Sequence, residues 1–468
     1  MCLTMLPGLE VASCSVKDLL HAGNMAIGKT NICGKLTIPE YQRSYVWGEK
    51  QVLRLLNDLN GHSAEADYYL GSLILHRTDG KLNIIDGQQR ITTLLILQQF
   101  QQDAIASGII YKSPVSMAGI QGNIKMLRGK LVSGKITIAN IDLGRINVTL
   151  VVTDSEDLAY TFFETQNTGG KRLSGPDIIK SHHLRAIRPA AQMNSKAVRW
   201  ESRDMAVIGH VISLLAKARF WDALERREFP SYRDKLAVKE SVVGEFTQNT
   251  LHNGPDRSYL TVEVVKGPHG EQMGYMSGLP AIRQPLSDGN NFMDYLDGYA
   301  GLYEQLFITQ GDYRVDPRFH LFRDAVINGE NGTAFLKDLF ELGVIVFVSR
   351  FGLKDLFGFS LWCFRYIYSL RVVKERTVRE DGVYAFARDM KLLDRILNAF
   401  SAEGLIEKLR DKDYTISTAN CGANNVKGKY ILMLGNYFSG QFSRESIDTT
   451  DFDNKLKKAI QWQMKKGS

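Results

Sequence analysis

A short apolar strand that turns at a glycine into a helix is the feature that most constrains this chain. The stretch runs from Ile84 to Leu94 and reads IIDGQQRITTL. Isoleucines favour a strand, Gly87 permits a tight turn, and the apolar residues that follow have helical spacing. The sequence therefore predicts that a run of polar side chains is gathered at one helix N-terminus.

A helix N-terminus offers free backbone N–H groups and a positive dipole end, so it favours phosphate. Gly87 allows the backbone to approach a ligand closely, and Arg90 adds a fork of donors that suits phosphate oxygens. The alternative is an ordinary structural helix with Asp86 as its N-cap. Two amides and an arginine before an apolar helix favour the phosphate interpretation.

The other polar residues of this motif have chemistry that fits a phosphate site. Asp86 can hold Mg²⁺ through a hard carboxylate oxygen, or orient a water for attack on a phosphoryl group. Gln88 and Gln89 can position water or read a base edge, because an amide both donates and accepts. Thr92 and Thr93 can cap the helix or contact phosphate.

A second cluster lies upstream, in the segment IPEYQRSYVW at residues 38–47. Tyr41 and Arg43 can reach a phosphate or a base, and we include their neighbour Gln42 among the candidate nucleotide-binding residues. Trp47 can stack on a ligand or fill the core, and the core is the commoner place for such a residue.

A third cluster is the glycine-containing loop at residues 167–173, which reads NTGGKRL. Asn167 and Lys171 make it a candidate anion-binding loop, although it lacks the ending of a Walker A motif. Asp177 and Lys180 follow on a predicted helix and complete the candidate set. A plain turn, with Asp177 as an early-helix acid that stabilises the dipole, is the alternative.

Composition excludes several classes of protein. Net charge is +7, and the stretch from residue 351 onward holds 20 Lys and Arg against 14 Asp and Glu, which permits a DNA partner without demanding one. Five cysteines without a CxxC pair argue against a disulfide framework or a zinc knuckle and favour the cytoplasm. The N-terminus has no secretory pattern, and charges interrupt the apolar stretch 342–370, so we expect buried core helices and no membrane span.

Periodicity divides the chain into three predicted regions. Residues 1–190 mix strands and helices, with the helix after Gly87 expected to continue to Ala106. Residues 191–310 are expected to be mainly helical with a loop-rich insertion, and residues 311–468 to form a helical basic region. The nine histidines end at His320. An HNH nuclease needs histidine as base and metal ligand, so we expect none after that position.

Taken together, the three clusters resemble the N-terminal domain of GmrSD-type modification-dependent restriction proteins. The family pattern has IPxYQRxYxW, DGQQRxTTL and NxxGxxLxxxDxxK segments in that order, and this chain has them at residues 38–47, 86–94 and 167–180. The resemblance covers roughly residues 10–190. It implies an α+β fold similar to ParB and sulfiredoxin, followed here by a mainly α-helical region.

The resemblance also implies a function in prokaryotic defence against modified or phage DNA. The domain would bind a nucleoside triphosphate (GTP, ATP or CTP) with Mg²⁺ and hydrolyse it through Asp86, Gln88, Gln89 and Arg90. Members of the family usually carry a C-terminal HNH nuclease domain. Because this sequence has no such motif, we expect the cutting to belong to a separate nuclease chain. A non-catalytic DNA- or nucleotide-binding subunit, and a nuclease that uses this domain itself, are the alternatives. The oligomeric state, homo-oligomer included, stays open.

Overall fold

The computed structural model describes most of the chain, with short gaps. It covers residues 8–61, 67–101, 108–138, 141–156, 158–159, 162, 174–222, 227–270, 272–276, 278–329, 334–375, 378–422, 425–439 and 451–466. The chain divides into two compact units, Met1–Asp204 (unit 1) and Met205–Ser468 (unit 2). This division does not test the three predicted regions, which remain a prediction.

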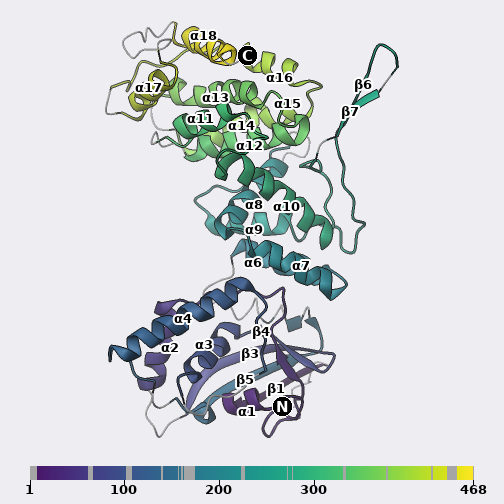
Figure 1. Ribbon diagram of the computed structural model, residues 1–468, viewed down its shortest axis with the longest axis vertical. Helices are drawn as coiled ribbons and strands as arrows, with labels where there is room; N and C mark the ends of the chain where they lie inside the picture. Colours follow the sequence, from purple (N-terminus) through teal and green to yellow (C-terminus); the bar gives the residue numbers. More distant parts are fainter. Residues whose placement is uncertain are drawn as a thin grey trace. The chain divides into compact units, whose positions relative to one another are not determined.

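Unit 1 contains a five-stranded mixed sheet covered by helices (Figure 1). The strands are β1 (Leu9–Ser15), β2 (Lys35–Thr37), β3 (Tyr68–Thr78), β4 (Lys81–Asp86) and β5 (Ile146–Thr153). The helices are α1 (Val16–His21), α2 (Glu49–Gly61), α3 (Gln88–Gln98), α4 (Pro114–Val132), η1 (Leu143–Arg145), α6 (Gly175–Ala186) and α7 (Ala190–Glu201).

The sheet has the order β1-β5-β3-β4-β2, in which antiparallel and parallel pairs alternate. The central strand β3 is apolar on both faces where Leu73, Ile74 and Leu75 are fully buried. Its pairing with β5 shifts register between Tyr69 and Gly71, which marks an irregularity in the strand. The β4 strand ends at Asp86, directly before α3, so this edge of the sheet presents the turn that carries the motif.

Unit 2 is mainly helical, with one two-stranded hairpin (Figure 1). Its first half contains α8 (Met205–Phe220), α9 (Lys235–Glu245), β6 (Val262–Lys266), β7 (Gln272–Met276), α10 (Asn290–Tyr303), η2 (Glu304–Ile308), α11 (Pro317–Phe322) and η3 (Arg323–Ile327). Its second half contains α12 (Ala334–Phe351), α13 (Leu356–Val373), α14 (Glu380–Met390), α15 (Leu392–Leu397), α16 (Ala402–Arg410), α17 (Val426–Tyr437) and α18 (Phe452–Lys465).

The expected buried helices at residues 342–370 are the centre of unit 2. They are α12 and α13, which pack on each other, with the Phe347 and Phe359 rings stacked 3.9 Å apart. In α13, Arg365 is buried and pairs with Asp453 of α18 at 2.5 Å, so its charge is neutralised inside the core. None of the described helices is long and apolar enough to cross a membrane. The predicted fold class, an α+β N-terminal region followed by a mainly helical one, is confirmed.

Candidate functional site

The turn between β4 and α3 is built around Gly87. Its φ is +99°, and a Cβ added there would lie 2.0 Å from Leu73 Cδ2, so only glycine fits. Gly87 is also the N-cap of α3, and no side chain caps the helix. The alternative with Asp86 as the N-cap is therefore wrong. The backbone N–H groups of Gln88, Gln89 and Arg90 have no hydrogen-bond acceptor among the described residues, as expected of an open helix start.

Arg90 holds the turn against the irregular part of β3. Its guanidinium donates to the Leu70 carbonyl at 3.1 Å, to the Ser72 carbonyl at 2.8 Å and to Asp86 Oδ2 at 2.8 Å. Gly71 makes room for it, because a Cβ at that position would lie 2.6 Å from Nη1. Most of the Arg90 fork is thus occupied by the protein itself, and Arg90 positions the motif.

Gln89 ties the upstream cluster to the first turn of α3. Its Oε1 accepts from the backbone N–H of Val46 at 2.9 Å and of Trp47 at 3.2 Å, and its Nε2 donates to the Ser44 carbonyl at 3.1 Å. The side chain is buried. Gln89 therefore brings the segment that carries Arg43 to the start of α3, which joins the first and second predicted clusters.

Two side chains of these two clusters form no hydrogen bond or ion pair with described residues, and a third uses only one of its two oxygens. The Gln88 side chain is only 5% exposed, yet its amide makes no hydrogen bond there and is not closed off from solvent. The guanidinium of Arg43 is half-buried and forms no ion pair. Asp86 keeps its Oδ1 atom outside the bond to Arg90. These groups are available to a ligand.

The two threonines of the motif point into the interior instead. Thr92 is bonded to the Tyr111 hydroxyl at 2.8 Å, and Thr93 to the Tyr45 hydroxyl at 2.8 Å. Burial raises the pKa of Tyr111 to about 12 and also raises the pKa of Tyr45, so both phenols stay neutral near pH 7. Asn123 of α4 donates to Tyr45 at 3.2 Å and extends this network.

The structure describes only part of the third cluster. Asn167 and Lys171 lie outside the described residues. Asp177 forms a capping box with Ser174 at the start of α6, which is the structural role that the alternative gave it. Lys180 is buried and donates to Glu201 Oε1 at 2.6 Å.

Glu201, at the end of α7, is a residue that sequence analysis missed. The same Oε1 atom accepts from the Ser44 hydroxyl at 2.7 Å, so one carboxylate connects Lys180 to the segment beside Arg43. No motif marks Glu201 in the sequence. The remaining predicted residues of the upstream cluster, Tyr41 and Gln42, are buried and half-buried respectively.

Unit 2 contains a separate polar cluster that sequence analysis also missed. The ligand atoms of His210, Asp338 and Glu341 lie within 4.8 Å of one another, as in a metal site. However, Lys217 donates to Asp338 at 3.0 Å and Lys337 lies 3.7 Å from Glu341. These ammonium groups already balance both carboxylates, so the cluster is better explained as an ion-pair network of the helical core.

Comparisons with known proteins agree with the two units. A search of curated proteins found no match. Residues 24–184 match the GmrSD restriction endonuclease N-terminal domain, which spans all three clusters. Residues 192–425, half of the chain, match a family of unknown function. The chain therefore belongs to the family of unknown function DUF7834, and its unit 1 carries a GmrSD restriction endonuclease N-terminal domain.

Proposed function

We propose that this chain is the nucleotide-binding component of a GmrSD-type, modification-dependent restriction system, and that it binds a nucleoside triphosphate at the start of α3. The observation that carries the proposal is the open first turn of α3 beside the unpartnered Gln88 amide. An uncapped helix start with free N–H groups binds anions. Arg43 would add a positive charge to the same phosphates.

Mg²⁺ would be held by the Asp86 Oδ1 atom together with phosphate oxygens and water. The residues fit this group only in that form, because among the described residues Asp86 does not lie in a group of three His, Cys, Asp or Glu ligand atoms that could hold a metal. Mg²⁺ commonly takes one or two protein carboxylates and completes its shell with phosphate and water. The ion would neutralise phosphate charge and leave Gln88 to orient a water toward the terminal phosphate.

We divide the four predicted catalytic residues into two kinds by their contacts. Asp86 and Gln88 have atoms that face no protein partner, so they are the candidates for contact with the reacting groups. Gln89 and Arg90 are occupied by backbone carbonyls and N–H groups, so we assign them as positioning residues. Thr92 and Thr93 would support the site from the interior.

A second candidate function is binding without hydrolysis. With Gln89 and Arg90 committed to the scaffold, the described residues leave few groups to stabilise charge in a transition state. In that case the bound nucleotide would act as a switch. Its state would alter how the chain engages DNA or a separate nuclease chain, a partner that the resemblance predicts.

Phosphate release from ATP, GTP, CTP and UTP with Mg²⁺ tests the proposal. It should be measured without DNA, with unmodified DNA and with base-modified DNA. Release from one nucleotide, abolished in Asp86→Asn, supports hydrolysis. Thermal stabilisation by a nucleotide without any release supports the switch. If no nucleotide is cleaved and none stabilises the protein, the proposal is wrong.

A further inference from the structure

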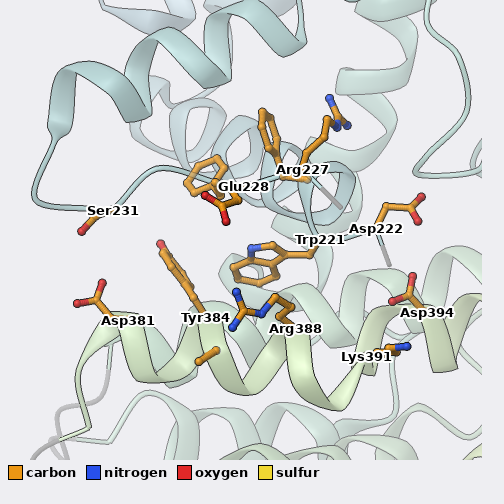
Figure 2. A pocket seen from close by; sticks show the side chains of 13 residues that line it. Trp221, Asp222, Arg227, Glu228, Ser231, Asp381, Tyr384, Arg388, Lys391 and Asp394 are labelled. Atoms are coloured by element: carbon orange, nitrogen blue, oxygen red, sulfur yellow. The ribbon is translucent and has the colours of Figure 1, made fainter. Parts of the chain in front are cut away.

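Unit 2 has a pocket that the function proposed for unit 1 does not use. It has a volume of about 620 Å³, which is in the range of small-molecule sites. It is lined by residues from the end of α8, the segment at 227–231, α14 and the start of α15. Figure 2 shows the Trp221 indole in the middle of this pocket, with Tyr384 and Glu228 near it and Arg388 on the α14 side.

The middle of the pocket is aromatic. Trp221 and Tyr384 meet with their centroids 5.1 Å apart at 62°, and Phe229 meets Tyr384 at 6.3 Å and 90°. In an edge-to-face contact, the ring that presents its edge does not have its flat faces covered by its partner ring. The indole N–H of Trp221 also has no acceptor among the described residues. The pocket thus offers a surface on which a planar ring can stack.

The charged groups around the aromatic centre are arranged in order along α14. Asp381, Tyr384 and Arg388 follow at spacings of three and four residues, so they share one face of the helix. Lys391, the C-cap that follows α14, also lines the pocket. Asp381 thus lies at one end of the pocket, the aromatic rings in the middle, and Arg388 and Lys391 at the other end, where Asp222 and Asp394 also line it but lie beside Arg283 (Figure 2). Glu228 adds a carboxylate from the facing segment.

These charges are mostly uncommitted. The side chains of Asp381, Glu228 and Lys391 form no hydrogen bond or ion pair with described residues, although Asp381 interacts electrostatically with Arg233. The Arg388 side chain contacts its neighbour Asp389, at 3.5 Å. The other charged groups of the lining are used by the fold. Asp394 pairs with Arg283 at 2.5 Å, and Arg227 pairs with Glu245 at 2.5 Å. The pocket therefore presents acceptors, a stacking surface and cations that can all serve a ligand.

From this arrangement we infer that unit 2 binds a nucleotide with its base in the aromatic centre. The base would stack on Trp221, and its N–H groups would donate to Glu228 and Asp381. The phosphate would lie at Arg388 and Lys391. A purely cationic ligand such as a quaternary ammonium would meet these two cations, which disfavours it. The nucleotide can be free or part of a DNA strand, because both present the same base and phosphate.

Calorimetric titration of the full chain with deoxynucleoside monophosphates tests this inference. EDTA removes Mg²⁺ from the site in unit 1, and deoxyribose 5-phosphate serves as the probe without a base. We expect monophosphates to bind and the sugar phosphate not to. Trp221→Ala should weaken binding about tenfold, as loss of base stacking does. The matched variant Trp462→Ala removes a partly exposed tryptophan outside the pocket and should have no effect.

Arg388→Ala tests the phosphate end, with Arg410→Ala as its control. Both arginines contact the aspartate that follows them, but Arg388 is exposed and lines the pocket, whereas Arg410 is half-buried and does not line it. Arg388→Ala should weaken monophosphates severalfold and leave unphosphorylated nucleosides unchanged. Because Arg388 and Asp381 are exposed, Arg388→Ala and Asp381→Asn also carry the test if Trp221→Ala does not fold.

A labelled single-stranded oligonucleotide separates the two sources. If it binds and competes with monophosphates, the ligand belongs to a strand; if it does neither, the ligand is a free nucleotide. Arg43→Ala in unit 1 should leave either result unchanged, so the two proposals fail independently. The inference is overturned if neither monophosphates nor strands bind at millimolar concentration, or if Trp221→Ala and Arg388→Ala both bind like the wild type.

Discussion

Arg90 and Asp86 bind each other across the turn between β4 and α3, with Nη2 of the arginine 2.8 Å from Oδ2 of the aspartate. The same guanidinium holds the Leu70 and Ser72 carbonyls of β3. The most prominent cation of the motif is thus occupied by the scaffold. Among the described residues of the three clusters, the cation left for a ligand is Arg43, which the motif alone does not single out.

Arg90→Ala should therefore lower stability as well as any activity. It leaves two carbonyls of β3 without their donor, which costs about 1–3 kcal/mol in the free energy of unfolding. Arg90→Lys should not restore it, because an ammonium cannot reproduce the planar fork. Thermal unfolding measures this, with the exposed Arg128→Ala as the control. Wild-type stability in Arg90→Ala would contradict the positioning role.

Gln89→Ala should disconnect the segment that carries Arg43. It removes three hydrogen bonds to the backbone of Ser44, Val46 and Trp47 and should cost about 1–3 kcal/mol. Nucleotide binding should weaken with it. The control is Gln101→Ala, since Gln101 donates to the Ile138 and Ile141 carbonyls elsewhere in unit 1. It should lose stability but keep binding; equal loss of binding in both variants would refute the specific role of Gln89.

Gly87→Ala should lower the free energy of unfolding clearly more than Gly80→Ala does. Both glycines have positive φ, which costs an alanine about 1–2 kcal/mol. Gly80 has open space where a Cβ would lie, whereas the Cβ at position 87 would overlap Leu73 and add about 1–3 kcal/mol. Chemical denaturation of the two variants measures the difference. Equal destabilisation would show that the turn is not as tightly packed as described.

We expect the protein to lose stability in mild acid because of His320. Burial, and then the nearby Arg323, lower its pKa below the ordinary value of 6.5, and neither ring nitrogen has a partner in the described residues. As the pH falls, His320 is therefore protonated more readily in the unfolded chain than in the folded one. Its contribution to the free energy of unfolding is fully present above about pH 6.5 and is lost as the pH drops below that value.

The His320→Gln variant isolates this effect. Its free energy of unfolding should change less than that of the wild type between about pH 7.5 and pH 5.5. Urea denaturation at the two pH values gives the comparison. Parallel losses in both proteins would mean that another group causes the pH dependence.

Much of the fold follows from local sequence. The strand, glycine turn and helix at residues 84–94 form as predicted, because β-branched residues, a positive φ and helical spacing are local signals. The end of α3 was predicted wrongly: it lies at Gln98 and not at Ala106, since residues 99–101 leave the helix. The predicted buried helices in 342–370 are also found, because an apolar stretch interrupted by single charges is typical of core helices.

The candidate site was less accessible from the sequence. The motif residues were identified, but their division into free and committed groups depends on contacts between distant segments. Gln89 meets residues more than forty positions away, and Glu201 meets Ser44 across 157 positions. No local pattern reports such pairings. The same holds for the pocket in unit 2, where Trp221 and Tyr384 come together only in the folded protein.

Equilibrium binding of the Mg²⁺ complexes of ATP, GTP, CTP and UTP to wild type and Arg43→Ala tests the central claim most directly. Because Arg43 has no ion pair among the described residues, its removal should leave stability unchanged. We expect one of these nucleotides to bind the wild type and Arg128→Ala equally, and to bind Arg43→Ala at least about tenfold more weakly. Equal affinity in all three proteins, or no binding by the wild type, would contradict it.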